Sequence, residues 1–72
     1  MPKFIMNKNA QPTGEHEVHN LDAGCKHLPM QKNFIELGFH TNCQSAVAYA
    51  KATYPSKVVD GCAFCTPQCH TR

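Results

Sequence analysis

Short apolar runs alternate with polar stretches along the whole chain. Four runs have the length and apolar content of short strands: KFIMN (3–7), EHEVHN (15–20), FIELGF (34–39) and KVVD (57–60). The polar stretch at 8–14, which contains Pro12 and Gly14, is typical of a loop. We therefore expect the second strand to return beside the first, and residues 22–33 to be irregular.

The helical signal is strongest at residues 41–54. Thr41 is a good N-cap, and Gln44 follows at the spacing of a capping box. Five residues fall on one helical stripe and are expected to be buried: Cys43, Ala46, Val47, Ala50 and Tyr54. Pro55 ends the helix, because the residue before a proline disfavours helical geometry.

The element order β-β-β-α-β predicts the fold class. We expect a small zinc-stapled α+β domain, with one helix on a short antiparallel sheet and a C-terminal cysteine knuckle (residues 61–65). The 72 residues allow a single domain, 1–72. A chain this short buries only about 60% of its unfolded surface, so its core needs support from disulfides, a metal or a partner.

Cysteine usage and the expected compartment favour a metal as that support. The chain has five cysteines and five histidines. Its first residues lack a signal-peptide run, and no stretch has the length of a membrane span, so we expect a cytoplasmic protein with no membrane partner. In a reducing cytosol, closely spaced cysteines more often bind metal or do redox work than form disulfides. The alternative is an exported protein with two disulfides and one free cysteine.

The clearest motif is the C-x-x-C pair of Cys62 and Cys65. Two intervening residues let both sulfurs face one ion, and this spacing makes up half of many structural zinc sites. Redox dithiols share the spacing, but Pro67 argues against the long helix that follows such a motif in redox proteins. Metal binding is therefore favoured over redox chemistry.

The other two zinc ligands must come from elsewhere in the chain. His19 and Cys25 flank a turn after the second predicted strand, where two ligands can converge. The alternates are Cys43, Cys69 and His70. Cys43 lies on the buried helical stripe, so packing in the core is its simpler interpretation, although a place in the first helical turn can lower a thiol pKa.

The order of these motifs resembles a known zinc module. The elements VH…C (18–25), NFIELGF (33–39), SAVAYAK (45–51) and DGCAFCTP (60–67) look like the metal-binding N-terminal domain of the Ada DNA-methylation repair protein. The resemblance covers about residues 17–67 and implies one structural Zn²⁺ held by His19, Cys25, Cys62 and Cys65. In that family the first ligand pair is two cysteines, one of which accepts methyl groups. Here His19 takes that place, which argues against the repair chemistry.

The functional expectation is a binding module without catalysis. The net charge is only +2 and the lysines are scattered, so nucleic acid is a weakly supported partner and another protein is the alternative. Lys51, Lys57 and Arg72 are the candidates for a modest basic patch. We expect a monomer and no enzyme, because no general base stands at metal spacing. A second hypothesis is a thiol-based redox or metal sensor in which Cys69 reacts with Cys65 or Cys62.

Overall fold

Four strands and one helix make up the fold of residues 1–71, which the computed structural model describes. Arg72, expected near the knuckle, lies outside these residues. The strands are β1 (Lys3–Asn7), β2 (Glu15–Asn20), β3 (Phe34–Phe39) and β4 (Val58–Gly61), and the helix is α1 (Cys43–Thr53). Three short 3₁₀ turns complete the list: η1 (Leu21–Ala23), η2 (Gln31–Asn33) and η3 (Pro67–Cys69). The predicted α+β class and the element order are confirmed.

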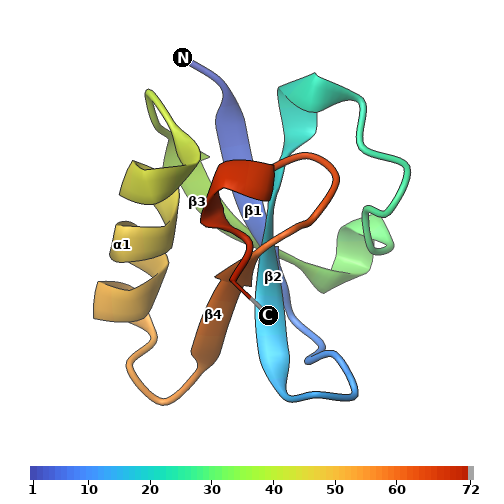
Figure 1. The fold of residues 1–72 in the computed structure, drawn as a ribbon, viewed down its shortest axis with the longest axis vertical. Helices are drawn as coiled ribbons and strands as arrows, with labels where there is room; N and C mark the ends of the chain where they lie inside the picture. Colours follow the sequence, from blue (N-terminus) through green and yellow to red (C-terminus); the bar gives the residue numbers. More distant parts are fainter. Residues whose placement is uncertain (72) are drawn as a thin grey trace.

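The four strands form one sheet in the order β3-β1-β2-β4 (Figure 1). β1 pairs antiparallel with β2, as expected, and also with β3. β4 pairs parallel with β2, so the sheet is mixed rather than purely antiparallel. The helix causes this difference, because it carries the chain across one face of the sheet and back to the start of a parallel strand.

The core lies between the sheet and α1. Alternate residues of the strands point toward the helix, among them Phe4 and Met6 of β1 and Val18 of β2. They pack against the predicted helical stripe, in which Cys43, Ala46 and Ala50 are buried and Val47 and Tyr54 are partly buried. This packing holds α1 on one face of the sheet and leaves the other face to the loops.

The ends of α1 differ slightly from the expectation. Asn42 rather than Thr41 is the N-cap, and its side chain accepts a hydrogen bond from the backbone N–H of Ser45. The helix ends with Tyr54 as C-cap, directly before Pro55. Because the N-cap is one residue later than expected, Cys43 is the first residue of the helix, next to the free N–H groups of the helix N-terminus.

No helix in residues 1–71 has the length and apolar content needed to span a bilayer.

Candidate metal centre

The parallel pairing of β2 and β4 brings the first two candidate ligands together. In this pair Val18 lies opposite Gly61, and the N–H of Cys62 continues the ladder by donating to the carbonyl of Val18 at 3.1 Å. Because parallel strands end at the same edge of a sheet, His19 near the end of β2 meets Cys62 just after β4. Residues far apart in the sequence thus share one edge.

A sharp turn after β2 returns Cys25 to the same edge. Asn20 caps η1 by accepting a hydrogen bond from the N–H of Asp22 at 2.9 Å. Gly24 ends η1 in the left-handed conformation, with φ of 68°, which is readily available only to glycine. The chain therefore reverses within a few residues, and Cys25 faces His19.

The knuckle brings in the fourth residue, Cys65. Its fold depends on Thr66, which is buried and donates its hydroxyl to the carbonyls of Val18 (2.9 Å) and Cys62 (3.2 Å). The N–H of Thr66 also bonds the carbonyl of Cys62 at 3.0 Å. Thr66 thus ties the C-x-x-C turn to β2.

The four residues offer ligand atoms within 4.8 Å of one another: His19, Cys25, Cys62 and Cys65. The Nδ1 atom of His19 lies 3.5 Å from the sulfur of Cys65 and 3.8 Å from that of Cys25, and the sulfurs of Cys25 and Cys62 are 3.8 Å apart. With zinc bond lengths of about 2.3 Å to sulfur and 2.0 Å to nitrogen, a tetrahedron has edges of roughly 3.5–3.8 Å. The cluster therefore has the size of a tetrahedral zinc site.

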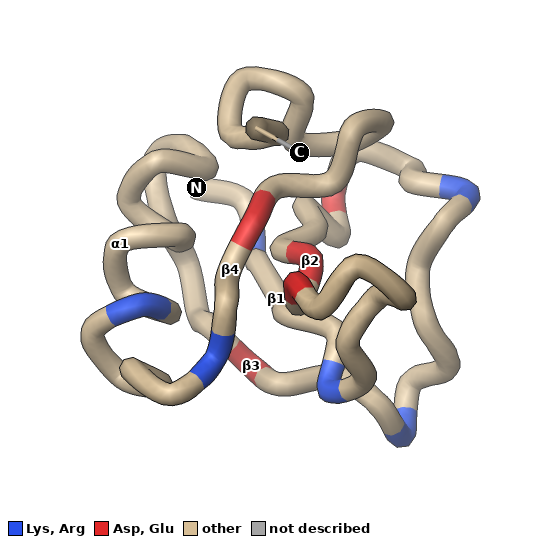
Figure 2. The backbone as a smooth tube through the Cα atoms, turned by 60° about the horizontal axis from the view of Figure 1, so that its bottom comes forward, with Lys and Arg blue, Asp and Glu red and all other residues tan. Residues whose placement is uncertain are grey.

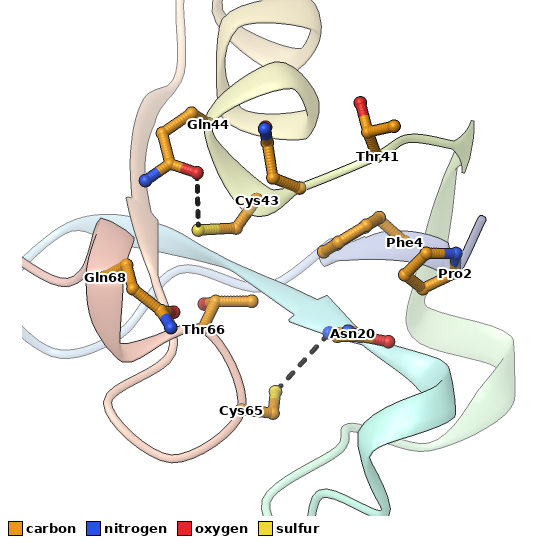
Figure 3. A pocket seen from close by; sticks show the side chains of 10 residues that line it. Pro2, Phe4, Asn20, Thr41, Cys43, Gln44, Cys65, Thr66 and Gln68 are labelled. Atoms are coloured by element: carbon orange, nitrogen blue, oxygen red, sulfur yellow. Dashed lines mark hydrogen bonds between the residues drawn. The ribbon is translucent and has the colours of Figure 1, made fainter.

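Backbone N–H groups point at two of the sulfurs. Asn20 donates to the sulfur of Cys65 at 3.4 Å (Figure 3), and Phe64 donates to that of Cys62 at 3.4 Å. Hydrogen bonds of this kind favour the thiolate, the form that binds metal. Such donors support the use of these cysteines as ligands.

Burial makes the site costly to ionise without a cation. It raises the pKa of Cys65, which the N–H of Asn20 opposes and the neighbouring thiols of Cys25 and Cys62 increase. It also lowers the pKa of His19 to about 4, with a smaller contribution from His27. A neutral imidazole is the form that coordinates metal, so His19 is already in the metal-binding form. The Cys65 thiol, whose pKa is raised, needs a nearby cation to release its proton.

One carboxylate near the site was missed by sequence reasoning. The Nε2 atom of His19 is buried with no hydrogen-bond partner in residues 1–71, and the carboxylate of Glu17 lies 4.0 Å away. Metal-binding histidines usually turn their second nitrogen toward such an acceptor. Glu17 and His19 are two residues apart on β2, so their side chains lie on the same face of the strand. This spacing is the sequence feature from which the contact could have been predicted.

Asp60, two residues before Cys62, contacts the C-terminal segment. It is buried and accepts hydrogen bonds from the N–H and hydroxyl of Thr71, both at 2.9 Å. Its second oxygen lies 3.5 Å from Nδ1 of His70. Asp60 therefore anchors the C-terminal segment rather than a metal ligand.

The alternate ligands lie apart from the cluster. Cys43 packs in the core, as expected, but it is joined to Cys69 in a disulfide. Cys69 is therefore not the free thiol that the sensor hypothesis needs. The Nδ1 atom of His70 contacts the carbonyl of Gly61 at 2.9 Å. The three alternates are thus engaged elsewhere by covalent or hydrogen bonds.

Close packing explains why Cys69 reaches the helix. A Cβ atom added to Gly61 would lie 2.7 Å from both the carbonyl carbon and Cβ of Cys69. Only glycine at position 61 allows the backbone of Cys69 to come this close. As a result η3 folds back over the end of β4, and Cys69 faces the first turn of α1. The spacing of the cysteines along the chain does not predict this contact.

No protein-family model, curated protein or solved structure matches the chain.

Proposed function

We propose that this protein is a small structural-zinc domain that serves as a binding module and has no catalytic activity. The observation that carries the proposal is the convergence of one imidazole nitrogen and three sulfurs within 4.8 Å of one another. Three of their pairs lie 3.5, 3.8 and 3.8 Å apart, close to the edges of a zinc tetrahedron. Three thiolates and one imidazole are a donor set typical of structural zinc. Zinc would join the turn after β2 to the knuckle after β4.

The donor set argues against catalysis. Four protein ligands complete a tetrahedron, whereas catalytic zinc keeps one position open for water or substrate. Three thiolates and Zn²⁺ together carry one negative charge, which would weaken Zn²⁺ as a Lewis acid. Support of the fold is therefore the better use of the ion.

A binding role is supported by an aromatic pair exposed at the metal site. Phe64, between Cys62 and Cys65, is 68% exposed. Its ring stacks on that of His27, with 3.8 Å between ring centroids. Exposed aromatic rings on a rigid support are typical of contact surfaces for proteins and for unpaired bases.

The charge distribution bears on the choice of partner. Figure 2 shows lysines and carboxylates interspersed over the backbone, with carboxylates on both β2 and β4. Lys51 lies in the last turn of α1 and Lys57 directly before β4, so the two lysines flank the loop that joins these elements. A continuous basic stripe of the kind used for duplex DNA is not formed by the described residues, so a protein or a short unpaired segment of nucleic acid fits better.

Cobalt substitution tests the metal site directly. Co²⁺ added to the metal-free protein should give the visible absorption of a tetrahedral site with three thiolates, and one equivalent of Zn²⁺ should abolish it. Cys62→Ser should lose the thiolate charge-transfer band and the native circular dichroism. A spectrum typical of octahedral cobalt would contradict the proposed site.

The binding role is tested by a matched pair of aromatic variants. Phe64→Ala should weaken binding of a labelled single-stranded oligonucleotide or of a candidate protein. Phe39→Ala removes another aromatic ring, 62% exposed on β3, and should leave binding unchanged. If the two variants change binding equally, the knuckle is not part of the contact surface.

A further inference from the structure

The Cys43–Cys69 disulfide joins two environments with different chemistry. Cys43 is the first residue of α1 and only 6% exposed, whereas Cys69 ends η3 and is half-buried. A cavity of about 280 Å³ is lined by Cys43 but not by Cys69 (Figure 3). A second, of about 310 Å³, is lined by Cys69 but not by Cys43. The two cysteines therefore border different cavities.

We propose that this disulfide is a thiol–disulfide exchange site, in which an external thiol attacks Cys69 and Cys43 is the leaving group. Exchange proceeds in line with the bond that breaks, so the attacking sulfur must reach Cys69 from the side away from Cys43. Cys69 is the more exposed of the two cysteines and borders the second cavity, so we expect the attacking thiol to enter there. The inference does not rest on the proposed zinc site, because neither cysteine belongs to it.

Cys43 is the first residue of α1, and this position favours its thiolate as the leaving group, although its burial acts in the opposite direction. The first N–H groups of a helix have no intrahelical acceptor, and with the helix dipole they stabilise a thiolate at the N-terminus and lower its pKa. A leaving thiol of lower pKa departs faster. Cys69 at the end of a single 3₁₀ turn has no such support.

Gln44 stands next to the leaving sulfur. Its Oε1 atom lies 3.6 Å from the sulfur of Cys43 (Figure 3). This contact is no hydrogen bond in the oxidised protein, because a disulfide sulfur carries no proton. A carboxamide can turn over and present its NH₂ group in the same place. Gln44 would then donate to the Cys43 thiolate as it forms.

The co-reactant is a small thiol that carries negative charge. The second cavity is lined by Lys51 from α1 and, among residues 1–71, by no Asp or Glu side chain, so it favours an anionic thiol such as glutathione. In the first step the thiolate bonds to the sulfur of Cys69, and the electron pair of the broken S–S bond stays on Cys43. A second thiolate then attacks the added sulfur, which releases an oxidised thiol dimer and the Cys69 thiolate. The protein gains two electrons, and the two thiols are oxidised.

The direction of attack can be read by mass spectrometry. The oxidised protein is treated briefly with glutathione, quenched with N-ethylmaleimide, unfolded and cut with trypsin. Residues 33–51 then carry Cys43 as their only cysteine, and residues 58–72 carry Cys69. We expect glutathione on Cys69 and the maleimide on Cys43. Glutathione on Cys43, an even mixture, or an intact disulfide would each overturn the proposal.

A charge variant tests the role of the helix end. Gln44→Glu places a carboxylate beside the Cys43 sulfur and should raise the pKa of the leaving thiol. Gln44 also lines the second cavity, so the pKa of Cys43 is read separately, from the pH dependence of its alkylation in the reduced protein, to distinguish this effect from repulsion of the attacking thiol. One unit of pKa should slow the first step roughly threefold. Gln31→Glu makes the same exposed change on η2 and is the control. Equal rates in the two variants would contradict the assigned polarity.

The metal content of the same sample separates the two proposals. A protein that binds no zinc but exchanges at Cys69 would overturn the proposed metal site and support the exchange site. A protein that binds zinc with an intact, unreactive disulfide would do the reverse.

Discussion

Loss of the Cys43–Cys69 disulfide should lower the stability of the protein by a large and calculable amount. The two cysteines are separated by 26 positions. In the chain-entropy treatment, closing a loop of that length removes about 12 cal/mol/K from the unfolded chain, or about 3.5 kcal/mol at 25 °C. Total stability for a chain of 72 residues is about 4–11 kcal/mol. The disulfide is therefore a major part of it.

The assay is urea unfolding of the zinc-loaded protein and of the Cys43→Ala, Cys69→Ala double variant. With a slope of about 1 kcal/mol/M for a domain of this size, the midpoint should fall by about 3 M. Wild-type protein reduced with a phosphine is the control, because it keeps the packing of Cys43 and loses only the covalent bond. A midpoint lowered by less than about 0.5 M in both samples would refute the reasoning.

Three further perturbations follow from the contacts around the site. Gly61→Ala brings a Cβ within 2.8 Å of the carbonyl oxygen of Thr66 and against the backbone of Cys69. Because the backbone cannot easily move aside, the substitution should lower the free energy of unfolding, measured in urea, by about 1–3 kcal/mol. An unchanged urea midpoint would show that the close contact of Gly61 with Cys69 is not kept in solution. Glu17→Gln removes the carboxylate beside Nε2 of His19 and should weaken zinc binding about 10-fold or more in competition with a chelator; wild-type affinity would exclude Glu17 from the site. Burial lowers the pKa of His19 from 6.5 to about 4, so the unfolded chain binds the extra proton between these values, and the free energy of unfolding should fall as the pH is lowered from 6.5 to 4. A urea midpoint that is constant across this range would contradict that assignment.

The regular elements were predictable because their signals are local. The strands at 3–7, 15–20 and 34–39 agree with the structure, and the one expected at 57–60 is observed one residue later. Alternation of apolar residues and the flanking Pro and Gly residues decide these elements within a few positions. The buried stripe of α1 was predictable for the same reason.

The pairing of elements was harder, because it depends on contacts between distant residues. The parallel pairing of β2 with β4 arises because α1 crosses one face of the sheet between β3 and β4. The disulfide depends on the approach of Cys69 to Gly61, and no spacing along the chain encodes that approach. The C-x-x-C pair was recognisable because both of its members lie in one turn. The role of Glu17 was indicated only by its i, i+2 spacing from His19 on β2, and that of Thr66, which bonds the carbonyl of Val18, depends on contacts between distant segments.

The four candidate metal ligands were predicted partly from local spacing and partly from the resemblance to a known family. Spacing gave Cys62 and Cys65, and the resemblance to the Ada module suggested His19 and Cys25, which the structure places within reach of one ion. The disulfide bears on the expected cytoplasmic location as well, since stable disulfides are more common in oxidising compartments. The compartment stays a prediction.

The mass of the freshly purified protein, measured first under native and then under denaturing conditions, tests the central claim most directly. One bound zinc in the native spectrum, with a denatured mass about 2 Da below that of the fully reduced chain, would match a four-ligand site beside a single disulfide. A native mass without metal and a denatured mass about 4 Da low would mean two disulfides. The cluster of His19, Cys25, Cys62 and Cys65 would then be no metal site.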